Sequence, residues 1–143
     1  MLNKRAIEER RVVITGASSG VGRALALELA PYRTQLLLVA RSEQPLVELS
    51  EELLQLGAGS VTRVVGDITQ QEVRQQIREK VSNDWQALDI LLNNAGTSSH
   101  GRFAAGDEDT LRGVREINFF ASTELSRLLV PNLYEDNDAV QGN

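Results

Sequence analysis

The sequence contains no cysteine, so disulfide bonds, thiolate metal sites and a cysteine nucleophile are all excluded. His100 is the single histidine, and one imidazole without a second ligand does not indicate a metal site. The longest unbroken apolar run covers about five residues, whereas a membrane-spanning helix needs roughly 20. The segment Met1–Arg11 is charged and lacks the apolar stretch of a signal peptide. We therefore expect a soluble, cytoplasmic protein that does not contact a membrane.

Basic residues are also few, with 15 lysines and arginines against 20 acidic residues and a net charge of −5. They are scattered along the chain, which argues against a nucleic-acid-binding face. Apolar residues make up 41% of the 143 residues, enough for the core of one ordinary domain. The expected organisation is a single domain over residues 1–143.

Short apolar segments alternate with segments of helical periodicity. Four segments have the length of buried strands, namely Arg11–Thr15, Gln35–Ala40, Val61–Val65 and Leu88–Leu92. The helical segments are Val21–Ala30, stopped by Pro31, then Ser42–Leu56, a helix that starts at Thr69, and Asp107–Val130, ending near Pro131. This alternation predicts a parallel sheet covered on both faces. Right-handed crossovers predict the strand order 3-2-1-4.

Two of these helices have clear start signals. Ser42 can cap the first of them and Gly57 can end it. Its apolar face is expected to contain Leu46, Leu49, Leu53 and Leu56. Thr69 and Glu72 have the spacing of a capping box. The face of that helix is expected to contain Val73, Ile77 and Val81.

A glycine-rich turn lies between the first strand and the first helix. Its spacing, Gly16-x-x-x-Gly20-x-Gly22, is neither the GxGxxG fingerprint nor a P-loop. Glycines let the backbone approach a ligand closely, and free N–H groups at a helix start favour an anion, best matched by a phosphate. The alternative is a plain tight turn in which the glycines serve helix–strand packing.

The end of the second strand bears on the choice of nucleotide. In dinucleotide folds an acidic residue at this place binds the ribose 2′-hydroxyl, whereas an arginine suits a 2′-phosphate. Here Ala40 stands where the acid would be, and Arg41 follows. A guanidinium pairs with a phosphate through a charged fork. The alternative is an ordinary solvated arginine after a strand.

Two motifs together resemble the short-chain dehydrogenase/reductase family. They are "TGASSGVG" at Thr15–Gly22 and "NNAG" at Asn93–Gly96, which follow the first and fourth predicted strands in the right order. "GDIT" at Gly66–Thr69 resembles the adenine-binding turn of that family, and Asn118 in "REINFF" resembles the asparagine of its catalytic tetrad. The resemblance implies a Rossmann-like, doubly wound, three-layer α/β/α domain whose C-terminal strands are missing.

The resemblance also implies a set of cofactor-binding residues. They are Gly16, Ser18, Ser19, Gly20, Val21, Gly22, Arg41, Ser42, Asp67, Ile68, Asn94, Ala95 and Gly96. The glycine turn would hold the pyrophosphate, Arg41 with Ser42 the 2′-phosphate, and Asp67 with Ile68 the adenine. The segment from Asn94 to Gly96 would pass under the nicotinamide ribose. NADP is therefore expected in preference to NAD.

Asn93 and Asn118 have different implied roles. Asn93 would tie the central strands together. Asn118 would hold a helix kink and a water of the proton relay, which makes it the catalytic residue of this chain. The alternative for Asn118 is local, because a polar side chain between Ile117 and Phe119 must find partners in any case. His100 is expected to be an exposed polar residue in a loop that borders the substrate cleft.

The Tyr-x-x-x-Lys pair of the family is not found. Four residues after Tyr32 comes Leu36, and four after Tyr134 comes Asp138. In the family the tyrosine exchanges the substrate proton and the lysine lowers its pKa. The expected catalytic serine would also come later in the chain, on a strand after Pro131. The resemblance thus implies the N-terminal, cofactor-binding part of an oxidoreductase.

Two functions remain open. The first is an NADP-dependent oxidoreductase that transfers hydride between the nicotinamide and an alcohol or carbonyl substrate, seen here in part. The second is a non-catalytic dinucleotide-binding module that lacks the Tyr–Lys pair. A fourth strand that pairs with the first strand alone would present an open apolar edge on its other side, so a homo-oligomer is expected.

Overall fold

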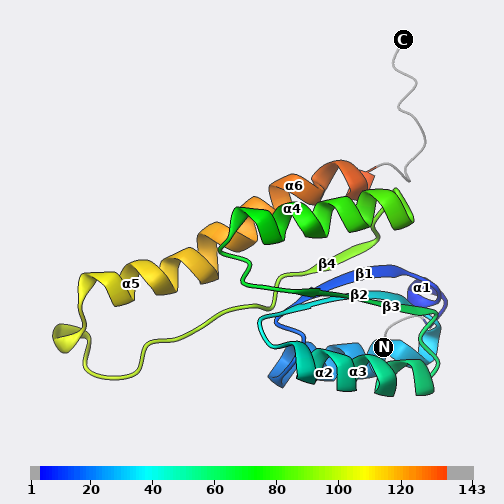
Figure 1. The fold of residues 1–143 in the computed structure, drawn as a ribbon, viewed down its shortest axis with the longest axis horizontal. Coiled ribbons are helices and arrows are strands. Elements are labelled where there is room, and N and C mark those ends of the chain that lie inside the picture. The colour runs from blue at the N-terminus through cyan, green and yellow to red at the C-terminus, as the bar shows by residue number, and fades with distance from the viewer. Residues whose placement is uncertain (1–3, 135–143) are drawn as a thin grey trace, which may run out of the picture.

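Four parallel strands form one sheet in the order β3-β2-β1-β4 (Figure 1). The structure is a computed structural model that describes residues 4–134. The strands are β1 (Arg11–Thr15), β2 (Gln35–Ala40), β3 (Ser60–Val65) and β4 (Ile90–Leu92). Each neighbouring pair is parallel, so the predicted order and direction are confirmed.

Helices cover both faces of the sheet and make three layers (Figure 1). One face carries α2 (Gly20–Leu29) and α3 (Glu43–Gln55), and the other carries α4 (Gln71–Lys80) and α6 (Ser122–Tyr134). Helix α5 (Glu108–Arg115) extends away from the sheet. The remaining elements are α1 (Lys4–Ile7), η1 (Ala30–Tyr32), η2 (Val81–Trp85), η3 (Phe103–Ala105) and η4 (Glu116–Ala121). No helix in residues 4–134 is long and apolar enough to cross a bilayer.

The central strands β1 and β2 are buried on both sides, which explains their unbroken apolar sequences. Val13, Leu37 and Val39 pack in one core with α4 and α6 residues, whereas Ile14 and Leu38 pack in the other with α2 and α3 residues. The edge strand β3 is less covered, and Val65 is 41% exposed. The apolar cores on the two faces of the sheet therefore fix the positions of the strands, and with them the carboxyl ends of neighbouring strands.

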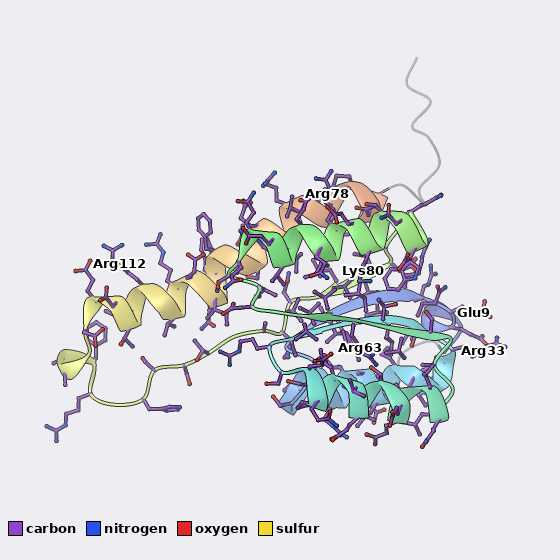
Figure 2. All side chains as sticks on the ribbon, viewed as in Figure 1. Glu9, Arg33, Arg63, Arg78, Lys80 and Arg112 are labelled. Atoms are coloured by element: carbon purple, nitrogen blue, oxygen red, sulfur yellow. The ribbon has the colours of Figure 1, made fainter. Side chains whose placement is uncertain are left out.

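Charged side chains join the amino ends of β1, β2 and β4, at the edge of the sheet opposite the carboxyl ends. The guanidinium of Arg33 pairs with the carboxylates of Glu8 at 2.6 Å and Glu9 at 3.2 Å (Figure 2). Asp89, just before β4, accepts hydrogen bonds from the side chains of Arg10 at 3.0 Å and Arg11 at 2.9 Å. These pairs fasten the strand starts to one another.

The predicted start of α4 at Thr69 is wrong. The N-cap residue is Gln70, which makes no side-chain cap hydrogen bond. The Thr69 hydroxyl is used elsewhere, because it donates to Asp67 Oδ1 at 2.8 Å, and the same oxygen accepts the Thr69 amide at 2.9 Å. Glu72 lies in the first turn of α4, where its charge suits the helix dipole.

Two smaller expectations in this region also need correction. Leu56 does not share the buried face of α3, because the helix ends at Gln55 and the Leu56 side chain is 44% exposed. The fourth strand begins at Ile90 and not at Leu88. The amide of Leu88 donates to the carbonyl of Asn132 on α6 at 2.9 Å, so the chain is held by a helix before it joins the sheet.

The long C-terminal helix differs from the single helix predicted over Asp107–Val130. It is interrupted by the π-helical segment η4 and continues past Pro131, which lies inside α6. Proline removes one helical hydrogen bond but does not end this helix. Asn132 explains the continuation, because it is buried and its side-chain amide donates to the Gln86 carbonyl at 2.9 Å. The last turn is thus held by contacts with the loop before β4.

Candidate functional site

A cleft of about 270 Å³ opens at the carboxyl ends of the strands. Its lining residues come from the end of β2, from the segments that follow the four strands and from one residue of η4. They are Gly16, Ser18, Ser19, Gly20, Val21, Val39, Ala40, Arg41, Gly66, Asp67, Ile68, Asn94, Ala95, Gly96 and Ile117. In open parallel sheets ligands bind at this edge, where the connections leave in opposite directions.

Three glycines shape the turn after β1 and the first turn of α2, and two of them have no room for a side chain. Gly16 has φ +65°, and a Cβ there would lie 2.9 Å from Ala95 Cα. A Cβ on Gly22 would meet the Gly16 carbonyl and would lie 2.5 Å from Asn94 Nδ2. Both positions are therefore closed to larger residues by contact with the segment after β4. Gly20 has φ +54° and faces open space.

The start of α2 lines the cleft with Ser19, Gly20 and Val21. Ser19 is the N-cap residue with extended backbone, and its side chain makes no cap hydrogen bond. The first amides of a helix have no partner within the helix, and the helix dipole makes this end positive. With glycines beside it, this end of the cleft is suited to an anionic group such as a phosphate.

The segment after β4 is held against β1 by Thr15. This buried hydroxyl accepts hydrogen bonds from the amides of Asn94 and Ala95, each at 3.0 Å. The Asn94 side chain donates to the Gly16 carbonyl at 3.1 Å. Asn93 does not link the strands as predicted, because its side chain donates to Ser126 on α6 at 2.9 Å. Thr15 and Asn94 make the link in its place.

Asp67 and Arg41 lie at the other end of the cleft, where β2 and β3 end. The Thr69 amide and then the Thr69 hydroxyl hydrogen-bond to the Asp67 carboxylate, and the charge of Arg41 adds to their effect. These interactions lower the pKa of Asp67 in spite of partial burial, so the group is a carboxylate at neutral pH. Arg41 is exposed and lines the cleft with Asp67. This end therefore offers one hydrogen-bond acceptor and one cation.

Three of the predicted residues lie outside the lining of this cleft. Gly22 is buried behind the turn, and Ser42 is an exposed N-cap residue of α3 without a side-chain cap hydrogen bond. Asn118 lines an adjoining shallow hollow with the segment Asn94–Ser98. The other predicted cofactor-binding residues all line the cleft.

Asn118 lies in the π-helical segment η4, so the expected irregularity of the helix is present. Its Oδ1 accepts the Thr97 amide and its Nδ2 donates to the Thr97 carbonyl, both at 2.7 Å. Gly96 lies beside this pair, since a Cβ there would lie 3.0 Å from Asn118 Oδ1. The asparagine thus fixes the chain that leaves the cleft.

His100 lies apart from the cleft. Its ring nitrogen is 3.3 Å from the Ser98 hydroxyl, and it lines a separate hollow of about 290 Å³ with Phe103 and Leu111. That hollow shares no lining residue with the cleft. Among the described residues no group of acidic side chains and histidine could hold a metal ion.

Comparison with known proteins decides the family, because the family model described as short chain dehydrogenase matches residues 10–142. The chain belongs to the short-chain dehydrogenase family. L-sorbose reductase from Gluconobacter frateurii, solved with NADPH and L-sorbose, superposes with a TM-score of 0.83 at 33% identity. That match covers 89% of this chain and 48% of the reductase.

Further members of the short-chain dehydrogenase family are similar over the same region. An alcohol dehydrogenase from Thermococcus sibiricus, complexed with 5-hydroxy-NADP, has a TM-score of 0.81 at 29% identity and covers 87% of this chain and 53% of its own. An 11-beta-hydroxysteroid dehydrogenase from Pinus massoniana is 33% identical over 135 residues, 94% of this chain and 38% of its own length. The chain thus spans between about a third and a half of these family members.

Some cleft residues of this short-chain dehydrogenase chain were not among those predicted. They are Val39, Ala40, Gly66 and Ile117, with Thr15 behind the cleft. Val39, Ala40 and Gly66 could be predicted from their places in the sequence, because Val39 and Ala40 end the second apolar strand and Gly66 directly follows the third. Thr15 has a weaker signal, as a hydroxyl at the end of an apolar strand. Ile117 depends on the path of η4, which local sequence does not reveal.

Proposed function

We propose that this chain is the cofactor-binding part of an NADP-dependent oxidoreductase that transfers hydride between the nicotinamide and an alcohol or carbonyl carbon. The observation that carries the proposal is the Ala40–Arg41 end of β2, which faces the cleft with a cation where an acid would select NAD. A guanidinium is a good partner for a 2′-phosphate. Solved relatives complexed with NADPH and 5-hydroxy-NADP support the cofactor class.

The residues of the cleft fit such a cofactor. Gly16 and Gly22 let the turn pack against the segment after β4, and Gly20 faces open space at the start of α2, where backbone amides suit a phosphate. We assign the pyrophosphate to this turn, the adenine to Asp67 and Ile68, and the nicotinamide ribose to the segment Asn94–Gly96. When bound, the cofactor supplies or accepts the hydride.

The proton of such a reaction needs a separate acid–base group. We propose that Asn118 contributes to this proton transfer in two ways. It fixes Thr97 beside the cleft, and it holds a water of the proton relay. The tyrosine of a Tyr-x-x-x-Lys pair is not provided by Tyr32, because Leu36 stands four residues later. Asp138, four residues after Tyr134, lies outside the described residues. We therefore expect the 143-residue chain to bind cofactor without turnover, since such groups contribute roughly 10²–10⁴-fold.

A non-catalytic dinucleotide-binding module is the second candidate, because residues 1–143 include the cleft and no Tyr-x-x-x-Lys pair. Reading the coding sequence beyond Asn143 separates the two candidates. A continuing frame with a serine and a Tyr-x-x-x-Lys pair supports the enzyme, whereas a stop codon supports the module.

Titration calorimetry of the chain with NADPH and NADH tests the cofactor. We expect tighter binding of NADPH, and a loss for R41A of about 1.5–3 kcal/mol, the value of a charged hydrogen bond. Arg63 is an exposed arginine on β3 (Figure 2), and R63A serves as the matched control. Equal affinity of the unchanged protein for both cofactors, or equal losses in R41A and R63A, would contradict the NADP assignment.

A further inference from the structure

A buried arginine lies directly behind the end of the cleft that contains Asp67. Arg74 is in the first half of α4 and is only 8% exposed. Its Nη1 donates to the carbonyl of Ile68 at 2.7 Å and to the carbonyl of Thr69 at 2.9 Å. Both carbonyls belong to the turn between β3 and α4, and Ile68 itself lines the cleft.

The same turn is held from the cleft side by Asp67. Its carboxylate accepts the amide and the hydroxyl of Thr69 at 2.9 and 2.8 Å. The turn is therefore held by two side chains. Asp67 binds the amide and hydroxyl of Thr69, and Arg74 binds the carbonyls of Ile68 and Thr69. Of these two residues, Asp67 lines the cleft and can contact a ligand there. Arg74 is buried and does not line the cleft.

The cost of burying a guanidinium indicates that Arg74 does more than fill space, because a buried charge needs compensation. Glu124 on α6 provides part of it. A hydrogen bond from Arg127 is the main cause that lowers the pKa of Glu124, and the positive charge of Arg74 adds to it. Helices α4 and α6 lie side by side on the same face of the sheet (Figure 1). Arg74 thus joins the turn to α4, and its charge acts on Glu124 of the neighbouring helix.

We propose that Arg74 is a positioning residue for the cofactor, which holds the Asp67–Thr69 turn in the shape that receives the adenine half of the dinucleotide. The proposal rests on the proposed function of the cleft. Loss of Arg74 leaves two carbonyls without their donor, and the turn then admits water and moves. The far end of the cleft, at Asn94–Gly96, has its own support from Thr15 and does not depend on Arg74.

Binding of the two halves of the cofactor, measured separately, distinguishes a positioning role of Arg74 from an effect on the stability of the whole fold. For R74M we expect about tenfold weaker binding of adenosine 2′,5′-bisphosphate, the scale of one charged hydrogen bond, and unchanged binding of reduced nicotinamide mononucleotide. R74K can still donate to one carbonyl and is expected to recover part of the loss. R78M is the matched control, because Arg78 is exposed on the same helix and lies on the side away from the sheet (Figure 2).

Circular dichroism at the titration temperature shows the folded fraction of each variant. Unchanged affinity of folded R74M for the adenosine half overturns the proposal, as does an equal loss for both halves of the cofactor. If the unchanged chain binds neither half, the proposed function fails, and hydrogen exchange then tests Arg74 by itself. R74M should speed exchange of the Thr69 and Gln70 amides and leave the Asn94 and Ala95 amides unchanged. Equal exchange of the turn amides in R74M and R78M refutes the positioning role.

Discussion

The side-chain amide of Asn118 pairs with both backbone polar groups of Thr97, each at 2.7 Å. This pairing joins η4 to the segment that leaves the cleft after β4. It uses one donor and one acceptor of the asparagine, so a carboxylate cannot reproduce it. Asn118 thus has the local partners that any polar side chain at this position needs. The same contact with Thr97 also shapes the edge of the cleft.

Asn118→Ala should release Thr97 from η4. Because the pair is exposed, we expect a loss of unfolding free energy of only about 0.5–1.5 kcal/mol. Asn118→Asp keeps the acceptor for the Thr97 amide and loses the donor for its carbonyl, so its effect should be intermediate. Hydrogen exchange of the Thr97 amide checks both. Equal protection in Asn118→Ala and the unchanged chain would show that the pair does not hold this segment.

Gly22→Ala should destabilise the fold. The added Cβ would meet the Gly16 carbonyl and Asn94 Nδ2, and overpacking of this kind costs about 1–3 kcal/mol. Gly113→Ala is the matched control, because a Cβ at this position in α5 meets nothing within 4 Å. Alanine is the better helix former there, so a gain of about 0.5–1 kcal/mol is expected. Urea unfolding of both variants tests the opposite signs, and a stable Gly22→Ala would show that the turn relaxes.

Ala40→Asp should shift the cofactor preference towards NAD. A carboxylate at the end of β2 can bind a ribose 2′-hydroxyl and repels a 2′-phosphate. We expect NADPH binding to weaken about tenfold or more, while NADH binding is kept or improved. Competition between the two cofactors in one titration measures the ratio. An unchanged ratio would mean that the ribose does not lie beside Ala40.

Stability should depend on pH through Asp89. Burial alone would raise its pKa, but hydrogen bonds from the side chain and amide of Arg11, the Arg11 charge and a hydrogen bond from Arg10 together lower it. A lowered pKa stabilises the fold at pH values above the unfolded pKa of about 3.9, and this contribution is lost as pH falls through the folded value.

Asp89→Asn should therefore cost about 2 kcal/mol at pH 7 and progressively less below about pH 4. Unfolding by urea from pH 7 down to pH 3 gives the difference between the two proteins at each pH. Asp84 is exposed and shows what a surface aspartate contributes, so Asp84→Asn is the control. A difference that stays constant with pH would contradict the assigned ionic role of Asp89.

The sequence was sufficient for the sheet and for most of the cleft, because both depend on local patterns. Buried apolar runs located β1 and β2, and the glycine spacing located the turn that contacts Ala95. Sequence reasoning failed where a distant partner decides the structure. Asn132 holds Leu88 away from β4 and keeps α6 helical beyond Pro131, and neither effect has a local signal.

The position of Asp67 shows the same limit on a smaller scale. Its carboxylate takes the Thr69 hydroxyl, so a plausible capping box does not form and α4 begins one residue later. Arg74, whose contacts complete this turn, looks in the sequence like any polar residue of an amphipathic helix. Its burial depends on α6 and on the path of the turn, which only the folded chain reveals.

The edge strand β4 is expected to make the chain associate. In the described sheet β4 pairs with β1 alone, and its residues Ile90–Leu92 are apolar and partly buried. Phe119 and Phe120 in η4 are 59% and 51% exposed, which adds apolar surface on the neighbouring segment. Open strand edges and apolar patches both favour pairing with another chain. The net charge of −5 should slow this process without removing its cause.

Sedimentation velocity over a range of concentrations should therefore show dimers or larger species of the 143-residue chain. Leu91→Lys places a charge on the edge strand and should shift the distribution towards monomer, whereas the control Thr62→Lys on the opposite edge strand should not. Hydrogen exchange should show weaker protection of the Ile90–Leu92 amides in the monomer than in the associated form. A monomer that unfolds cooperatively, with these amides protected as strongly as those of β1, would show that β4 is already covered and that the association is not built into this edge.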